Sequence, residues 1–140
     1  MPGAYDLHSN IKLAHSIAPA AHVGDTTGAT VDTDGFESIE FTLQVGVAMA
    51  GGGFTCEIQQ AVDAGGSPGV WVAVPAADLL GGSMVITIAD ANKVYRQGSV
   101  GKERFQRLVL TETDGISGGV VGSIAILSNP RSVPTAAQAT

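Results

Sequence analysis

The sequence has little of what several protein classes require. A single cysteine among 140 residues excludes an internal disulfide, and a domain of this length can bury roughly two-thirds of its surface without one. Charged residues make up 14%, well below the roughly 25% typical of soluble domains, and the 19 glycines are about twice the usual share. This composition favours many short strands and turns over long solvated helices.

Long apolar runs are also missing. Stretches such as 119–127 fall well short of the roughly 20 residues that a membrane-spanning helix requires. The start of the chain, with Asp6 and His8, has no basic segment followed by an apolar one, so we expect no secretory signal and a soluble protein made in a cytoplasm. The net charge of −6 and the few clustered bases give a weak field for phosphates. We expect neither a membrane nor nucleic acid as a partner.

Charge is distributed unevenly along the chain. Residues 1–90 hold one base and ten acids, a net of −9, whereas residues 91–140 hold six bases and three acids, a net of +3. The basic stretch could meet acidic patches on a partner protein. The alternative is that its side chains are solvated or pair with acids of this same chain.

Apolar residues alternate with polar ones in two neighbouring segments. In 36–47 the apolar positions are Ile39, Phe41, Leu43, Val45 and Val47, and after the glycines at 51–53 they are Phe54, Cys56 and Ile58. A period of two is typical of a half-buried strand. The two segments, joined through a glycine turn, predict a hairpin.

Further strands are indicated between turn signals rich in Gly, Asp and Asn. They cover 11–17, 70–74, 84–88, 94–97, 104–111 and 120–127, and only 75–80 has some helical character, for one turn at most. Short strands at this spacing predict an all-β fold, an antiparallel two-sheet sandwich that is jelly-roll-like. The expected single domain is 11–128, with extended arms at 1–10 and 129–140. Its expected core includes Ile39, Phe41, Leu43, Val45, Phe54, Ile58, Val109, Ile124 and Ile126.

Two motifs match catalytic patterns only in part. The segment 115–119 satisfies G-x-S-x-G, but no Asp or His follows Ser117, so a glycine-rich turn is the better interpretation. The segment 98–103 is similar to a phosphate loop but lacks the full frame, and Glu103 replaces the hydroxyl residue that would hold magnesium. We expect it to connect two strands.

No metal or nucleophile site is indicated. His8, His15 and His22 recur every seven residues, which in extended chain sends successive side chains to opposite faces. The segment 32–35 lacks the later ligands of a calcium loop and predicts a turn, and Cys56 is expected to be a small buried hydrophobe. We therefore expect no catalytic residues, no metal and no cofactor, and not an enzyme.

Three segments carry a resemblance to a known family. They are Tyr5–Lys12, Val94–Leu108 and Leu127–Pro134. Together they resemble head cement (decoration) proteins of tailed bacteriophages, across most of the chain. The family pattern has a Gly-Tyr, an Arg-Tyr-Val-Arg and a His-Pro where this sequence has Gly98-Ser99, Arg104 to Arg107 and Asn129-Pro130.

The resemblance implies a sandwich domain that dimerises and clamps neighbouring major capsid proteins. Its expected place is the outer surface of the virion capsid, after a stage in the host cytoplasm during assembly. Together with the charge distribution, it makes the basic strand region and the arms the expected capsid contacts. The residues are Tyr5, Leu7, Ile11, Arg96, Lys102, Arg104, Arg107 and Arg131.

Other functions stay open at this point. Jelly rolls also serve as lectins, so a carbohydrate- or receptor-binding sandwich is one alternative, although the chain has only one Trp and two Tyr to supply a sugar platform. A head-tail or tail-tube subunit, which would form rings instead of dimers, is another.

Overall fold

The structure is a computed structural model of the 140-residue chain, and it describes residues 6–47, 50–115 and 119–132. In these residues the regular elements are strands, apart from a 3-10 turn at Ala76–Asp78 (η2). The strands are β1 (Ile11–Ala21), β2 (Thr26–Thr27), β3 (Val31–Asp32), β4 (Phe36–Val45), β5 (Gly53–Asp63), β6 (Pro68–Ala73), β7 (Leu79–Leu80), β8 (Val85–Ile86), β9 (Val94–Ser99), β10 (Phe105–Thr113) and β11 (Val120–Pro130). An all-β chain with a single helical turn after residue 75 is confirmed.

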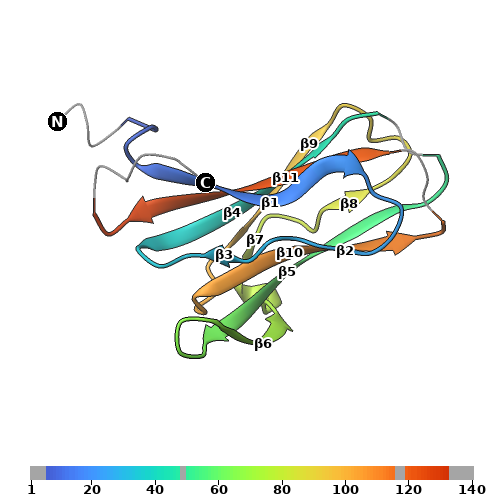
Figure 1. Cartoon of the computed structure of the whole chain (residues 1–140). Coiled ribbons are helices and arrows are strands. Elements are labelled where there is room, and N and C mark those ends of the chain that lie inside the picture. Colours follow the sequence, from blue (N-terminus) through green and yellow to red (C-terminus); the bar gives the residue numbers. More distant parts are fainter. Residues whose placement is uncertain (1–5, 48–49, 116–118, 133–140) are drawn as a thin grey trace.

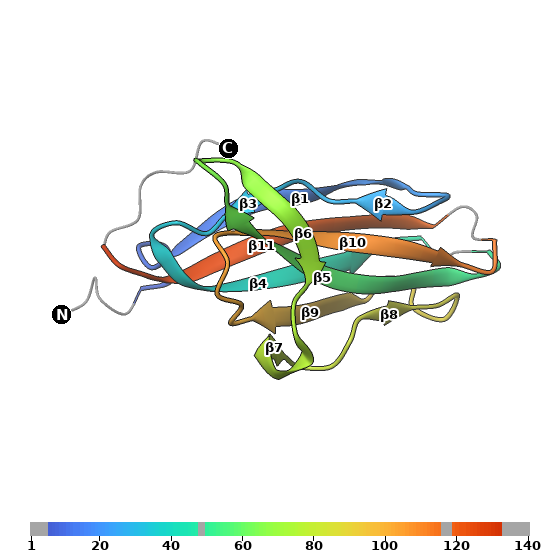
Figure 2. The same ribbon diagram turned by 90° about the horizontal axis from the view of Figure 1, so that it is seen from below.

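The strands form two antiparallel sheets that pack face to face, as Figure 1 shows from the side and Figure 2 from below. Sheet A has the strand order β1-β11-β4-β9-β7 in the described chain. Sheet B has the order β2-β10-β5-β6, with β3 also pairing with β10 and β8 with β5. The predicted two-sheet sandwich is therefore confirmed.

The pairing follows a simple rule when β2 and β3 are taken as one interrupted strand and the short β7 and β8 as additions. The first strand pairs with the last (β1 with β11), the second with the seventh (β2 and β3 with β10), the third with the sixth (β4 with β9) and the fourth with the fifth (β5 with β6). A long antiparallel ribbon rolled over on itself has this order, which gives the two Greek keys of a jelly roll.

The predicted hairpin between 36–47 and 54–59 is wrong. β4 pairs with β11 and β9 in sheet A, whereas β5 pairs with β10, β6 and β8 in sheet B. Two strands with one apolar face each can lie side by side or face each other across a core, and the alternation is the same in both cases. Here the connection after β4 crosses from one sheet to the other.

The core lies between the sheets. Ile39, Phe41, Leu43, Val45, Phe54 and Ile58 are buried as predicted, each 3% exposed or less. The prediction is wrong for three positions: Ile124 is 45% exposed, and Val109 and Ile126 are only partly buried. On both strands the alternate positions are apolar too, and the ladders turn Leu108, Leu110, Ala125 and Leu127 inward instead.

The other predicted strands are present with shifted ends. The strand expected at 84–88 shrinks to the two-residue β8, and the one expected at 11–17 lengthens to Ala21. β1 begins at Ile11 as expected, and β11 continues to Pro130, two residues past the expected domain end. Residues 1–5 and 133–140 of the expected arms lie outside the described residues.

Candidate functional site

One end of the sandwich, called here the terminal end, brings together segments that are far apart in the sequence. At this end β1 begins and β11 finishes, with Ile11 opposite Ser128 in their ladder. β4 begins beside them, because Phe36 lies opposite Pro130. The connection between β9 and β10 reaches the same end, where a cleft of ≈ 380 Å³ is lined by residues 100–104, by Thr33, Asp34, Phe36 and Glu37, and by Arg131.

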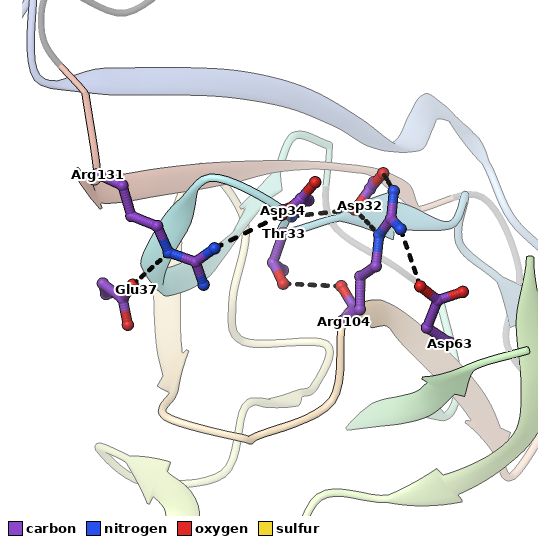
Figure 3. A network of polar contacts seen from close by, with 7 residues as sticks. All are labelled: Asp32, Thr33, Asp34, Glu37, Asp63, Arg104 and Arg131. Carbon is purple, nitrogen blue, oxygen red and sulfur yellow. Dashed lines mark hydrogen bonds and ion pairs between the residues drawn. The ribbon is translucent and has the colours of Figure 1, made fainter. Parts of the chain in front are cut away.

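Arg104 ties three strands together at the terminal end (Figure 3). Its guanidinium donates to Asp32 on β3 in a bidentate pair, Nε to Oδ1 at 2.8 Å and Nη2 to Oδ2 at 2.7 Å, and Nη1 donates to Asp63 of β5 at 2.9 Å. Its carbonyl accepts from the Thr33 hydroxyl at 2.7 Å. A planar guanidinium that donates two hydrogen bonds to one carboxylate forms a strong ion pair. Arg104 therefore fixes β3 and the end of β5 to the start of β10.

Hydrogen bonds lower the pKa of these two carboxyl groups. The pKa of Asp32 lies below its usual value, mainly because the Arg104 side chain donates to it. The pKa of Asp63 is also lowered, first by the backbone N–H of Gly66 and then by Arg104. The pKa of Arg104 is raised in turn, with Asp32 as the main cause. All three groups are therefore ionised at neutral pH.

Arg131 makes a second group of ion pairs next to the first, also seen in Figure 3. Its Nε donates to Glu37 Oε1 at 2.7 Å, and its Nη1 lies 3.6 Å from Asp34 Oδ1. Its backbone N–H donates to the carbonyl of Gly35 at 2.9 Å. These contacts fix the end of β11 to the turn between β3 and β4, and they raise the pKa of Arg131, mainly through Glu37.

The turn between β3 and β4 is the turn predicted from residues 32–35. The backbone N–H of Asp34 donates to Asp32 Oδ1 at 3.0 Å, and Phe36 N–H closes the turn on the Thr33 carbonyl at 3.0 Å. Gly35 has a φ of +89°, which a residue without Cβ adopts freely. The acids of the turn thereby face Arg104 and Arg131, so two of the expected capsid contacts pair with this chain's own acids.

Lys102 lines the cleft between these two groups. Its side chain is exposed, and no carboxylate of the described residues forms an ion pair with it. The segment 98–103, in which it lies, runs from the end of β9 into the connection to β10, as predicted. Lys102 is therefore a base of the terminal end whose charge is available to a partner.

Leu7 and Ile11 lie on the other side of β11 at the same end. They line an open hollow of ≈ 500 Å³ with Asp6, Asn10 and residues 128–130, and Leu7 is 71% exposed. The Asp6 carboxylate accepts from the Ser9 N–H at 2.6 Å, which lowers its pKa and holds the turn before β1. Tyr5 lies outside the described residues.

Arg96 and Arg107 lie away from the terminal end and from each other. Arg96 is on the outer face of sheet A, with its Nε 3.7 Å from Glu40 Oε1. Arg107 is on the outer face of sheet B, where its guanidinium carbon lies 4.2 Å from the centre of the Trp71 ring and its Nε donates to Gln59 at 2.9 Å. The eight predicted contact residues therefore do not form one surface.

The other features considered from the sequence are a metal site, a membrane-spanning helix, Cys56 and the G-x-S-x-G segment. Among the described residues, no group of three or more His, Cys, Asp or Glu could hold a metal ion. No helix in the described chain is long and apolar enough to cross a membrane. Cys56 packs against the core, where burial raises the pKa of its thiol to about 12. The G-x-S-x-G segment falls mostly on 116–118, outside the described residues.

Sequence reasoning missed two features of this region. The pairing of Asp32, Glu37 and Asp63 with bases up to 94 residues away could not be read from charge counts, because it depends on which strands become neighbours. The stacking of Arg107 on Trp71 depends likewise on the joining of β10 and β6 through β5. Only the spacing of the turn at 32–35 gave a local signal.

No family model and no curated protein matches this chain. Among solved structures, a chain of infectious bursal disease virus, Gx strain, is similar over 89% of this chain at 11% identity and a TM-score of 0.48. This chain spans 35% of that one. The SPBc2 prophage-derived protein YomS is similar over 85% of this chain and 95% of its own length, at 14% identity and a TM-score of 0.39.

A third similar structure comes from Bacillus endospore appendages, described as disulfide-linked pili. It shares 10% identity over 89% of this chain and 95% of its own length, with a TM-score of 0.36. A virus and a prophage are thus among the sources of these similar folds. Identities and TM-scores this low carry no argument about function.

Proposed function

We propose that the protein is a structural component of a tailed-phage virion that binds the outside of the capsid and joins neighbouring major capsid proteins. One observation supports this most directly. The three segments that carry the family resemblance lie far apart in the sequence, yet one part of each, within 6–11, 100–104 and 128–131, lies at the terminal end. The proposed role depends on surface contact and needs no catalysis, metal or cofactor.

The residues of the terminal end have two different roles, holding the strands in place and contacting the partner. Arg104 and Arg131 are engaged by Asp32, Asp63 and Glu37, so their role is to hold the strands and the turn in place. Lys102 and Leu7 are exposed and can reach a partner. The contact with the capsid is therefore expected to be partly apolar.

Leu7 is expected to contribute more binding free energy to the capsid contact than Lys102. Burying an exposed leucine side chain contributes about 1.5–3 kcal/mol, whereas a solvent-exposed ion pair to a lysine contributes about 0–1 kcal/mol. Either is weak alone. Tethering on an assembled shell raises the effective concentration, so many such contacts act together. We also propose that the protein acts as a homodimer, so that each dimer presents two terminal ends to the capsid.

The test is co-sedimentation of the protein with purified capsids that lack it, comparing matched pairs of variants. Leu7→Ala is paired with Val23→Ala, because Leu7 is 71% and Val23 69% exposed and Val23 follows β1 at the opposite end. Lys102→Gln is compared with Lys93→Gln, just before β9 at the opposite end, where Lys93 forms an ion pair with Asp90 at 3.0 Å.

We expect Leu7→Ala to weaken capsid binding about tenfold or more, which corresponds to about 1.4 kcal/mol. Lys102→Gln should weaken it less, and that loss should shrink as salt is added. Both controls should bind as the parent does. Equal binding by all four variants would contradict attachment through the terminal end.

The sugar-binding alternative has less support. The one tryptophan, Trp71, lies on the outer face of sheet B, and the Arg107 guanidinium covers one side of its ring at 4.2 Å. A sugar platform needs an open aromatic face. A ring-forming head-tail subunit differs from the proposed dimer in mass, so native mass spectrometry separates the two.

A further inference from the structure

The inner face of sheet B becomes polar where it reaches the terminal end. Gln60 of β5 and Gln106 of β10 lie opposite each other in their ladder, and they are 8% and 1% exposed. Their neighbours on the same face, Ile58 and Leu108, are buried apolar residues. Glutamine is seldom buried inside a sandwich, because its amide needs hydrogen-bond partners there.

Each of these two glutamines has an amide oxygen that lacks a donor. None of the described residues donates a hydrogen bond to Gln60 Oε1 or to Gln106 Oε1, and both atoms are shielded from solvent. A buried amide oxygen that has given up water and gained no donor destabilises the folded state. Two such atoms on neighbouring strands therefore indicate a donor other than the described residues.

Ser99 of β9 brings a third polar group to the same place from sheet A. It is 1% exposed, and its Oγ accepts from the Gly101 N–H at 3.0 Å, so its own hydroxyl proton remains to be donated. A Cβ added to that glycine would lie 2.5 Å from Gln60 Oε1, 2.9 Å from Ser99 Oγ and 3.2 Å from Gln106 Nε2. Polar side chains of both sheets therefore converge beside Gly101.

A cavity of ≈ 30 Å³ lies at this point. Its lining includes Ser99, Gly101 and Gln106, and it shares Phe36 and Glu37 with the cleft of the terminal end. A buried water needs about 10–15 Å³ of space for its centre and two to four polar partners. The cavity therefore has room for a water molecule but not for a side chain of a partner.

We propose that this cavity binds one water molecule, which joins the two sheets at the terminal end. The water donates its two protons to Gln60 Oε1 and Gln106 Oε1 and accepts the hydroxyl proton of Ser99. Three hydrogen bonds are typical of a buried water, and these three satisfy every polar group named above. The inference goes beyond the proposed function and does not depend on it.

The charges around the cavity favour water over a metal cation. The three polar groups are two amides and a hydroxyl, which carry no charge. Glu37 also lines the cavity, but its carboxylate is engaged by Arg131 at 2.7 Å, and Lys102 and Arg104 line the cleft next to it. Calcium and magnesium sites rely on carboxylate ligands. A cation here would meet nearby bases and no available carboxylate.

The water would also explain the glycine at position 101. The φ of Gly101 lies outside the left-handed region, so the position does not need the backbone freedom of glycine. It needs the missing Cβ, which would crowd Gln60 and Ser99. Because Ser99 ends β9 and Gln106 follows the start of β10, the water ties together the two ends of the connection that carries Lys102.

A crystal structure of the protein tests the site directly. We expect one density peak in the cavity, within about 2.6–3.2 Å of Gln60 Oε1, Gln106 Oε1 and Ser99 Oγ. An empty cavity, or a direct hydrogen bond between the two glutamine amides, would overturn the proposal. A peak about 2.3–2.6 Å from six or more oxygens would identify a cation and would also overturn it.

A double-mutant cycle in urea gives a second test, in solution. Gln60→Leu and Gln106→Leu should each raise the unfolding equilibrium constant about fivefold or more, because each removes a partner of the water. The double variant should raise it no further than the larger single change, since the water is already lost. Gln44→Leu, at an exposed position of β4, is the control and should change it less than twofold.

The opposite signs are informative. If the amide oxygens have no donor, each leucine removes an unpaired buried polar group and the unfolding constant should fall. A fall in both single variants, or additive effects in the double variant, would overturn the shared water.

Discussion

Two alanine substitutions on β11 test which of its faces is inside. Leu127 is 0% exposed, so Leu127→Ala removes a fully buried side chain and leaves a cavity. Such changes cost about 2–5 kcal/mol of unfolding free energy. Ile124 is 45% exposed, so Ile124→Ala forfeits only part of the burial energy of its side chain, about 1 kcal/mol or less.

The assay is urea unfolding followed by circular dichroism, with the free energy obtained by linear extrapolation. Low protein concentration keeps self-association from adding to the apparent stability. We expect Leu127→Ala to cost at least 1 kcal/mol more than Ile124→Ala, with unchanged slopes. Equal costs, or a larger cost at Ile124, would refute the face assignment and return β11 to the register that periodicity suggested.

Three further outcomes follow from the contacts described. Arg104→Met should destabilise the fold more at pH 7 than at pH 3, because the lowered pKa of Asp32 contributes stability that is complete above the unfolded carboxyl pKa of about 4 and declines as the pH falls through the folded value; equal drops in melting temperature at both pH values would count against the pair. Gly53→Ala should cost about 1–3 kcal/mol, since a Cβ there would collide with a backbone carbonyl of β8, whereas Gly82→Ala, with open space around it, should cost much less in the same urea assay. The thiol of Cys56, whose pKa is raised to about 12 by burial, should react with a disulfide reagent at pH 8 far more slowly in the folded protein than in urea, and equal rates would mean that it is solvated.

The sequence predicts best where one face of a strand is apolar and the other polar. β4 has Glu40, Thr42 and Gln44 between its apolar residues, and its inward face was identified correctly. β11 has Ile124 and Ile126 on one face and Ala125 and Leu127 on the other, so periodicity could not choose between them.

Pairing between distant strands is what the sequence could not supply. β4 and β5 follow each other in the chain and have similar alternation, yet they lie in opposite sheets. The same holds for charge. The excess of acids before residue 91 and of bases after it does not become a two-ended surface, because Asp32 and Asp63 fold against Arg104. The turn at 32–35 was predictable because its geometry is local.

A cryo-EM reconstruction of capsids decorated with this protein tests the central claim most directly. We expect density for the sandwich on the outside of the shell, with the terminal end against the capsid and Leu7 and Lys102 at the contact between neighbouring capsid proteins. Val23 and the turn before β9 should face solvent. Density attached through that opposite end, or located only at the tail or portal, would contradict the account.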